Sequence, residues 1–344
     1  MNQKEPPAVT SAANIRVDVH LDPDQLRAAL RTEARAGLTA SPKQLSPKWF
    51  YDERGCELFE AITRLPEYYP TRREQEILTE NAAAIAELTG ADTVVELGSG
   101  TSAKTRTLLD AFAARGRLER FVAFDLSEPT LRAAAASIAK GYPGIALHAV
   151  VGDFDHHLGD LPGGGRRLVA FLGGTIGNLG PDRRASFLKE LATSLRPGDS
   201  FLLGTDLVKD VARLEAAYDD SAGVTAMFNL NVLAVLNRDL GADFDLHRFH
   251  HVARFDVERE WIEMALRSTT DQVVTVADLD LRVPFATGEE MRTEISAKFR
   301  RSGLEAEMQA AGLELARWWT DTAGDFALSL WTPAGAGLGS PSPG

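Results

Sequence analysis

The sequence has very little cysteine and no long apolar run, and each absence excludes a class of protein. Cys56 is the only cysteine among 344 residues, so neither an internal disulfide nor a four-thiolate metal site can form. No apolar stretch approaches the ~20 residues that a membrane-spanning helix needs. The N-terminus, MNQKEPP, also lacks the apolar core of a signal peptide. We therefore expect a cytoplasmic protein that binds no membrane.

Basic clusters are also scarce. The formal net charge is −12, and no basic run is longer than two arginines. Nucleic acid and anionic membrane surfaces are poor partners for such a chain, because both attract positive charge. The hydrophobic fraction of 44% is ordinary for a globular protein that buries a sizeable core. We expect a monomer.

What the sequence does contain is a strand, a tight glycine turn and a helix start in residues 93–104, which read TVVELGSGTSAK. Gly98 and Gly100 suit a turn that needs φ values other residues avoid and that a ligand approaches closely. Lys104 is a candidate partner for a ligand carboxylate, or an exposed helix lysine. This stretch alone fits a cofactor site and an ordinary β-to-α turn equally well.

A βαβ alternation follows. Helical segments separate further apolar runs, at residues 121–124, 146–151, 167–172 and 200–203. This alternation predicts an α/β protein with a Rossmann-like, doubly wound and mostly parallel sheet. After residue 210 the pattern changes to helices and then to alternating strands between residues 251 and 283, which indicates an antiparallel sheet with one wet face. Residues 289–299 and 302–311 are predicted as helices, and 326–332 as a last strand.

These changes predict two domains. A discontinuous α+β substrate-binding domain with antiparallel strands takes residues 16–72 and 209–297, and the sheet domain takes residues 73–208 and 298–332. Residues 1–15 and 333–344 are small, polar or rich in Gly and Pro, and we expect both tails to be disordered. Aromatic residues gather beside prolines before the first strand, Tyr51 and Tyr68 among them. They could form a binding wall or a hydrophobic cap over the core.

Acidic residues end the second and third strands. Asp125 could accept two ribose hydroxyls, and Asp153 could accept from an adenine amine with Phe154 stacking beside it. Because parallel strands end at one rim of the sheet, these residues and the glycine turn together favour a cofactor site. The form ELGSGTS, with a carboxylate before the first glycine, resembles that seen in S-adenosylmethionine-dependent methyltransferases.

Two other groups leave alternatives open. Glu294 and Ser296 would point together on an extended segment and could hold a ring N–H, but the sequence alone favours a solvated helix that separates them. His247, His250 and His251 could hold a metal on one helical face. Since no further ligand motif accompanies them, we favour a solvated surface and expect no metal.

Longer strings carry a family resemblance: PKWFYD, ITRLPEYYPTR, ELGSGTSAKTR, FLGGTIGNL, LLGTDLVKD and TEISAKF. From about residue 36 to residue 331 the chain resembles the histidine-specific N-alpha-methyltransferases of ergothioneine biosynthesis. The resemblance implies trimethylation of L-histidine to hercynine with S-adenosylmethionine as co-substrate. The glycine pair Gly173-Gly174 stands where the family has Gly-Ser, and we expect a backbone role there.

The resemblance also implies residue roles. Glu294 and Ser296, with Tyr68, would clamp the imidazole, which requires the extended alternative. Tyr51 would lie near the amino group during methylation and is the catalytic candidate. The other substrate-binding residues would be Asn178, Tyr218 and Met264, and the cofactor-binding residues Gly98, Lys104, Asp125, Asp153 and Phe154. Competing hypotheses are a methyltransferase for another amine, a non-catalytic cofactor-binding protein, and a nicotinamide oxidoreductase.

Overall fold

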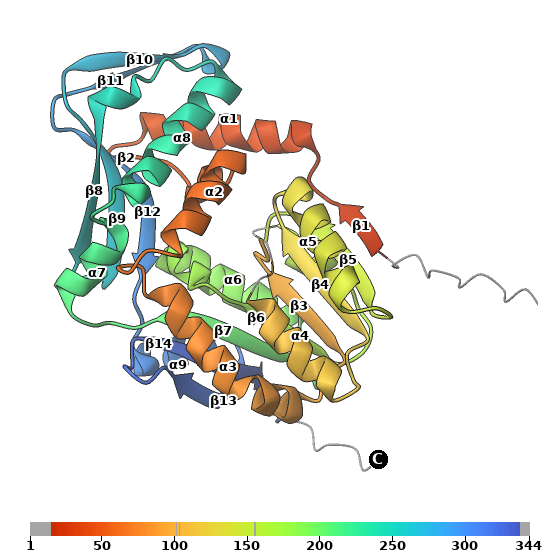
Figure 1. Cartoon of the computed structure of the whole chain (residues 1–344). Helices are drawn as coiled ribbons and strands as arrows, with labels where there is room; N and C mark the ends of the chain where they lie inside the picture. The colour runs from red at the N-terminus through yellow and green to blue at the C-terminus, as the bar shows by residue number, and fades with distance from the viewer. Residues whose placement is uncertain (1–14, 101, 103, 155, 338–344) are drawn as a thin grey trace, which may run out of the picture.

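The computed structural model describes residues 15–100, 102, 104–154 and 156–337, and an eight-stranded sheet forms the lower right part of the molecule in the view of Figure 1. The strand order is β1–β5–β4–β3–β6–β7–β14–β13. The first six strands in this order run parallel to one another. Strand β14 runs antiparallel to β7, and β13 runs antiparallel to β14. Their bounds are β1 (Ile15–Val19), β3 (Thr93–Leu97), β4 (Arg120–Asp125), β5 (Ala146–Val151), β6 (Arg167–Phe171), β7 (Ser200–Asp206), β13 (Leu313–Thr320) and β14 (Phe326–Pro333). The predicted doubly wound, mostly parallel sheet is confirmed.

The chain reverses its direction of travel across the sheet between β3 and β6. It runs outward from β3 to β4 and β5, and then returns to add β6 and β7 on the other side of β3. Sheets of this kind bind ligands beyond the carboxyl ends of the strands at such a switch point. Gly98 follows β3 and Gly173 lies two residues after β6, so both glycine turns stand at this position.

Helices cover both faces of the sheet. Residues of α3 (Pro70–Thr89), α4 (Thr105–Ala114) and α5 (Glu128–Gly141) pack on one face, and residues of α6 (Pro181–Ser194) and α9 (Arg301–Ala310) pack on the other. Val94 belongs to the first core and Val95 to the second, as the two-residue period of a strand requires. Burial on both faces explains why these strands are continuous apolar runs rather than alternating ones.

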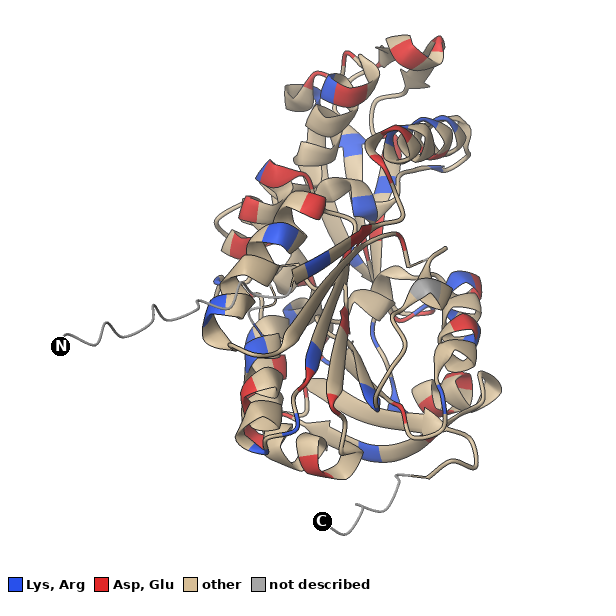
Figure 2. Cartoon of the chain, turned by 90° about the vertical axis from the view of Figure 1, so that its right-hand side faces the viewer, with Lys and Arg blue, Asp and Glu red and all other residues tan. Residues whose placement is uncertain are grey.

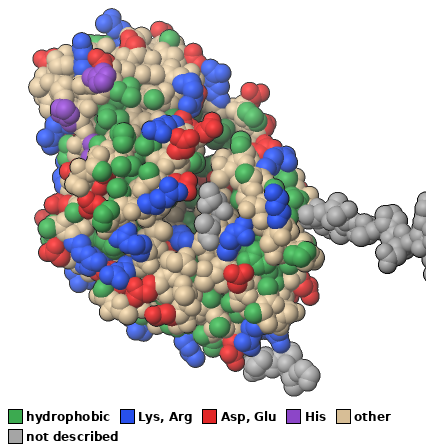
Figure 3. All heavy atoms as spheres, in the orientation of Figure 1, with side chains coloured by type: hydrophobic (Ala, Val, Ile, Leu, Met, Phe, Trp, Pro, Cys, Tyr) green, Lys and Arg blue, Asp and Glu red, His purple; other side chains and the backbone are tan. Residues whose placement is uncertain are grey.

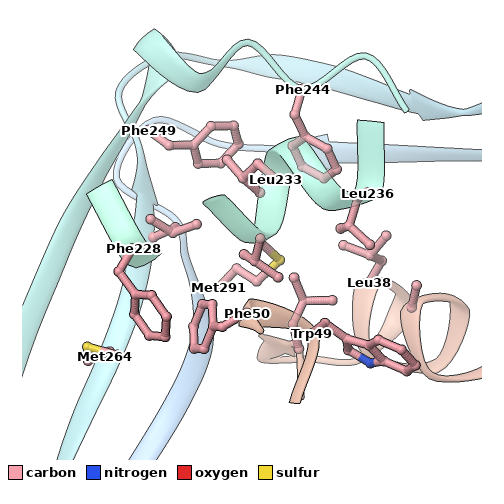
Figure 4. Packing of buried hydrophobic residues seen from close by; sticks show 14 of the residues in the cluster. Leu38, Trp49, Phe50, Phe228, Leu233, Leu236, Phe244, Phe249, Met264 and Met291 are labelled. Carbon is pink, nitrogen blue, oxygen red and sulfur yellow. The ribbon is translucent and has the colours of Figure 1, made fainter. Parts of the chain in front are cut away.

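A third core, separate from the two cores of the large sheet, joins the N-terminal segment to residues 214–291 (Figure 4). Its sheet has the order β2–β12–β9–β8, beside the hairpin β10–β11. Phe50 and Phe228 meet in this core with ring centroids 4.6 Å apart, which supports the proposed substrate-binding domain. The elements are α1 (Pro23–Thr39), β2 (Lys43–Gln44), α2 (Glu53–Ile62), α7 (Val211–Tyr218), α8 (Val224–Leu240), β8 (Phe249–Asp256), β9 (Trp261–Ser268), β10 (Gln272–Val276), β11 (Leu281–Phe285) and β12 (Glu290–Ala297). The 3₁₀ turns are η1 (Pro47–Phe50), η2 (Leu158–Asp160), η3 (Thr175–Asn178), η4 (Leu246–Arg248) and η5 (Ala277–Leu279).

Two local predictions are wrong, and one strand was missed. Residues 289–299 contain strand β12 rather than a helix, because the segment pairs with β9 along its length. Strand β1 pairs with β5, so residues 16–19 lie in the large sheet and not in the substrate-binding part. Strand β13 was not predicted, since its half-exposed pattern carries little apolar signal. Ile15 and Pro333 also belong to strands, whereas residues 1–14 and 338–344 of the predicted tails lie outside the described residues.

Charged residues of both signs are interspersed along the outer helices (Figure 2). The face shown in Figure 3 likewise mixes basic, acidic and hydrophobic side chains. Within the described part of the chain, no helix is both long and apolar enough to cross a membrane.

The close contact between η1 and α2 leaves no room for a side chain at Gly55, and this can be tested. A Cβ at this helical glycine would lie 1.6 Å from the Phe50 carbonyl oxygen, so Gly55→Ala is expected to cost about 3 kcal/mol despite the better helix propensity of alanine. Gly303 in α9 is the matched control, because nothing lies within 4 Å of a Cβ there. Gly303→Ala should stabilise by up to about 1 kcal/mol. Urea unfolding measures both, and equal effects would contradict the close approach.

Candidate active site

A pocket lies where η3, at the end of β6, meets β12, α2, α7 and α8. Every residue predicted for the substrate or for catalysis lines it: Tyr51, Tyr68, Asn178, Tyr218, Met264, Glu294 and Ser296. The aromatic residues Phe59 and Phe228 also line it and were not predicted. Gly173 and Gly174 complete the wall on the side of the large sheet. The structure thus brings together residues separated by more than 200 positions in the sequence.

Strand β12 places Glu294 and Ser296 on one side of the chain. Both side chains are buried, and Glu294 lies opposite Met264 of β9. A register shift between Arg292 and Glu294 interrupts the strand pairing. Glu290, before the shift, forms exposed ion pairs with Arg254 and Arg267 instead. The extended alternative is therefore correct, and the helical one is wrong.

Burial determines the charge state of Glu294. Removal from water raises the pKa of this carboxyl to about 7, although hydrogen bonding to Asn178 and the charge of Lys298 oppose the shift. Asn178 is itself held in place, because its Nδ2 donates to the Ile295 carbonyl at 3.2 Å. A buried hydrogen-bond donor would therefore stabilise the charged form of this carboxyl, which burial disfavours.

The tyrosines of the pocket fall into two kinds. Tyr68 and Tyr218 are buried with their rings 6.1 Å apart, and burial holds the pKa of both phenols well above its usual range, so they remain neutral donors. Tyr51 is 42% exposed, and its ring meets Phe59 and Phe228 edge to face at 5.6 Å each. Tyr51 therefore stands at the mouth of the pocket, beside an aromatic wall.

The glycine turn after β3 joins the end of β4. Gly98 and Gly100 have φ values of 66° and 47°, which L side chains rarely adopt. Asp125 Oδ2 accepts from the Gly100 N–H at 2.9 Å, and Oδ1 accepts from the Ser127 N–H at 3.1 Å. Burial raises the pKa of this carboxyl. Asp125 is thus fixed against the turn, while Thr101 and Ala103 lie outside the described residues.

Buried polar atoms without a partner gather at the same turn. Glu96 Oε2, Ser99 Oγ and Ser102 Oγ have no hydrogen-bond partner within the described part of the chain. Buried polar groups are normally paired, so a polar ligand suits this site. A carboxylate and two hydroxyls fit the ammonium and carboxylate of an amino-acid tail such as that of S-adenosylmethionine.

Lys104 connects this turn to the pocket. Its Nζ forms an ion pair with the buried Glu74, so the exposed-lysine alternative is wrong. Glu74 also accepts from the Gly173 N–H, at 2.8 and 3.0 Å to its two oxygens. Gly173 and Gly174 have φ values of 79° and 70°, in accord with the backbone role expected there. The ion pair leaves Lys104 beside the two glycine turns of the switch point.

The end of β5 carries the third predicted cofactor position. Asp153 Oδ2 lies 3.0 Å from Nζ of Lys48, which comes from η1 in the N-terminal segment. The ring of Phe154 packs edge to face against Phe171 and Phe187, with centroids 5.6 and 6.0 Å apart. Both residues therefore stand on the rim that Gly98 and Asp125 occupy.

The three candidate metal ligands are not on one helical face. His250 and His251 are neighbours on strand β8 and point to opposite sides, His250 exposed and His251 with only 3% of its side chain exposed. The His251 ring contacts the Asn229 amide and the Tyr218 carbonyl, each at 2.8 Å. The solvated-surface interpretation is thus wrong for His251, which supports the Tyr218 backbone. Among the described residues no group of three His, Cys, Asp or Glu could hold a metal.

The buried carboxyl of Glu96 should make the free energy of unfolding depend on pH. Burial raises its pKa from the ordinary 4.5 to about 7, so the folded protein retains a proton that the unfolded chain has released between these values. The free energy of unfolding therefore falls as pH rises through this window. Relative to the parent, the ligand-free Glu96→Gln variant should gain about 2–3 kcal/mol between pH 5 and pH 8. Urea unfolding at both pH values measures this gain, and a pH-independent difference would argue against a buried ionisation.

Comparison with known proteins identifies a matching family and several relatives. The family model described as "Histidine-specific methyltransferase, SAM-dependent" matches residues 30–333. A histidine N-alpha-methyltransferase from Mycolicibacterium smegmatis is 60% identical over 90% of this chain and 97% of its own length. One from Mycobacterium tuberculosis is 59% identical over 92% of this chain and 99% of its own length. The ergothioneine biosynthesis protein 1 of Neurospora crassa is 31% identical over 81% of this chain, which spans 32% of that longer protein.

Proposed function

The chain belongs to the family of histidine-specific, S-adenosylmethionine-dependent methyltransferases, and we propose that it methylates the α-amine of L-histidine three times, forming hercynine. This reaction is the first step of ergothioneine biosynthesis. One observation carries the proposal: a buried carboxylate and a buried hydroxyl, Glu294 and Ser296, share a pocket with Gly173 and Gly174, the turn that follows β6 at the switch point.

The imidazole ring suits the inner end of the pocket. Glu294 can accept from a ring N–H, and Ser296 can engage the other ring nitrogen, while Met264 and Tyr68 supply apolar walls. An apolar analogue would leave the two buried polar groups unpaired, which costs several kcal/mol and favours histidine. Discrimination between amino acids would therefore rest on these groups.

The amino-acid end of the substrate would lie toward the large sheet. Asn178 and Tyr218 present amide and phenol groups for the carboxylate and amine of histidine. Tyr51 would lie near the amine at the mouth of the pocket. Phe59 and Phe228, against which Tyr51 packs, extend this aromatic surface. Aromatic faces stabilise a cation that grows from a secondary to a quaternary ammonium.

S-adenosylmethionine, when bound, supplies a methyl group on a sulfonium centre with a good leaving group. Gly98, Asp125, Asp153 and Phe154 would bind its nucleoside, and Lys104 with the unpaired atoms at Glu96, Ser99 and Ser102 would meet its amino-acid tail. The pocket residues then need to align the neutral α-amine and to exclude water, because in-line displacement depends mainly on orientation.

A substrate panel tests the proposal. The pure protein is incubated with S-adenosylmethionine and each amino acid in turn, and mass spectrometry reads the products. We expect three added methyl groups on histidine alone. Methylation of an aromatic amino acid in preference to histidine would instead favour a different amine. Cofactor binding without S-adenosylhomocysteine release would indicate a non-catalytic protein.

A further inference from the structure

Lys298 directly follows β12 with a side chain that is 0% exposed, and it lies behind the residues that line the pocket. Its Nζ is 2.9 Å from Tyr218 Oη, 2.9 Å from Ser296 Oγ and 3.0 Å from Asp206 Oδ2. Two backbone hydrogen bonds hold the segment in place: Lys298 N–H donates to Glu260 at 2.7 Å and Phe299 N–H donates to Asp206 at 2.8 Å. The ammonium is therefore fixed beside two hydroxyls that line the pocket.

An ammonium has three protons and no lone pair, so it only donates hydrogen bonds. It donates to the two hydroxyl oxygens, and the Asp206 carboxylate lies at ion-pair distance. Tyr218 and Ser296 must therefore both accept from Lys298, and neither can donate back to it. Their own protons are directed elsewhere.

Counting these protons shows what remains for a ligand. Tyr218 Oη and Ser296 Oγ are 2.7 Å apart, so one of the two hydroxyl protons lies in the bond between them. Across the described residues, neither hydroxyl has another acceptor. Both side chains line the pocket, so the second proton is left to donate to a bound ligand.

We propose that Lys298 is a positioning residue that directs these protons so that Ser296 donates to a bare ring nitrogen of the substrate while Glu294 accepts from the ring N–H. A phenol is a better donor than an aliphatic alcohol, which favours Tyr218 donating to Ser296. The pocket then selects one neutral tautomer of the imidazole and rejects the imidazolium, which has no bare nitrogen. This inference rests on the proposed function and adds the protonation state of the substrate that is bound.

A second lysine offers a matched control. Lys209 is also buried and also pairs with Asp206, but its other hydrogen bonds go to Tyr69 Oη at 2.8 Å and to the Leu207 carbonyl at 2.6 Å. In the described part of the structure it contacts neither Ser296 nor Tyr218. Lys209→Met therefore removes a buried positive charge from the same aspartate without touching the hydroxyl pair.

The kinetic test compares Lys298→Met with Lys209→Met. We expect Lys298→Met to raise the KM for histidine about 10- to 100-fold, because one or two buried hydrogen bonds are lost. The KM for S-adenosylmethionine should be unchanged. Lys209→Met should change the KM for histidine less than about threefold, because its hydrogen bonds lie outside the pocket. If Lys298 acts through Ser296, adding Ser296→Ala to Lys298→Met should cost less than about threefold more. Equal effects of the two lysine variants, or an additive double variant, would overturn the proposal.

A spectroscopic test needs no variant. Nitrogen-15 NMR of labelled histidine, bound to the parent protein with S-adenosylhomocysteine at pH 6, should show a single neutral tautomer although free histidine is then partly imidazolium. A bound imidazolium would refute the inference while leaving histidine methylation intact.

Lys298→Gln, which keeps two donor protons, replaces Lys298→Met if that variant fails to fold, and it should show a smaller rise in KM. If the KM for histidine were unchanged in Lys298→Gln and the bound histidine were an imidazolium, the proposed role of Lys298 would be rejected.

Discussion

Replacing Glu294 by alanine is expected to lower kcat/KM for histidine by about 10²- to 10³-fold, because losing a buried, charge-assisted hydrogen bond costs about 3–4 kcal/mol. The affinity for S-adenosylmethionine should stay within about twofold, since Glu294 lies on β12 and the glycine turn follows β3. Steady-state kinetics with histidine and calorimetry with the cofactor measure the two quantities separately.

Glu290→Ala is the control for this variant. It removes the same charge from the same strand, but Glu290 pairs with arginines at the surface and does not line the pocket. Exposed ion pairs contribute little, so histidine kinetics should remain close to those of the parent. Parent-like kinetics in Glu294→Ala itself would refute the proposal that Glu294 binds the imidazole ring.

The second large effect is expected at Asp125. Asp125→Ala should weaken S-adenosylmethionine binding about 100-fold, because two hydrogen bonds from ribose hydroxyls to a charged group are worth about 3 kcal/mol together. The variant also releases the Gly100 and Ser127 N–H groups, which the carboxylate now holds. Asp125→Asn retains an acceptor oxygen and should lose less.

Calorimetry with S-adenosylmethionine measures this loss, and Glu128→Ala serves as its control. Glu128 lies in the first turn of α5, three residues from Asp125, and pairs with Arg132 at the surface. Its replacement should leave the dissociation constant within about twofold. Unchanged cofactor binding in Asp125→Ala would refute the role given to the end of β4.

The sheet could be predicted from the sequence to a large extent, and the edges could not. Strands β3 to β7 are apolar runs separated by helices, and this pattern depends on local hydrophobicity alone. Strand β1 is partly exposed, and it can be recognised only once β5 is present to pair with it. Strand β12 looked like an amphipathic helix for a similar reason, since its pairing with β9 supplies the hydrogen bonds that decide its conformation.

The site was predictable in two different degrees. Gly98, Asp125 and Asp153 follow from the rule that parallel strands end at one rim, so spacing alone indicated them. The roles of Glu294, Ser296 and Tyr218 came from family resemblance, because the residue pattern alone favoured a helix that separates Glu294 from Ser296. Phe59 and Phe228 carried no signal beyond being aromatic, and only the tertiary structure places them in the pocket wall beside Tyr51.

The sequence by itself determined the class of sheet, the glycine turn with its strand-end carboxylates, and through matched motifs the family. Only the tertiary structure decided how the hydroxyls of the pocket are held. Lys298 and Tyr218 are 80 residues apart, and Asp206 comes from a different strand of a different sheet. Hydrogen-bond direction depends on which atoms lie within about 3 Å of one another, and separation along the chain does not specify that.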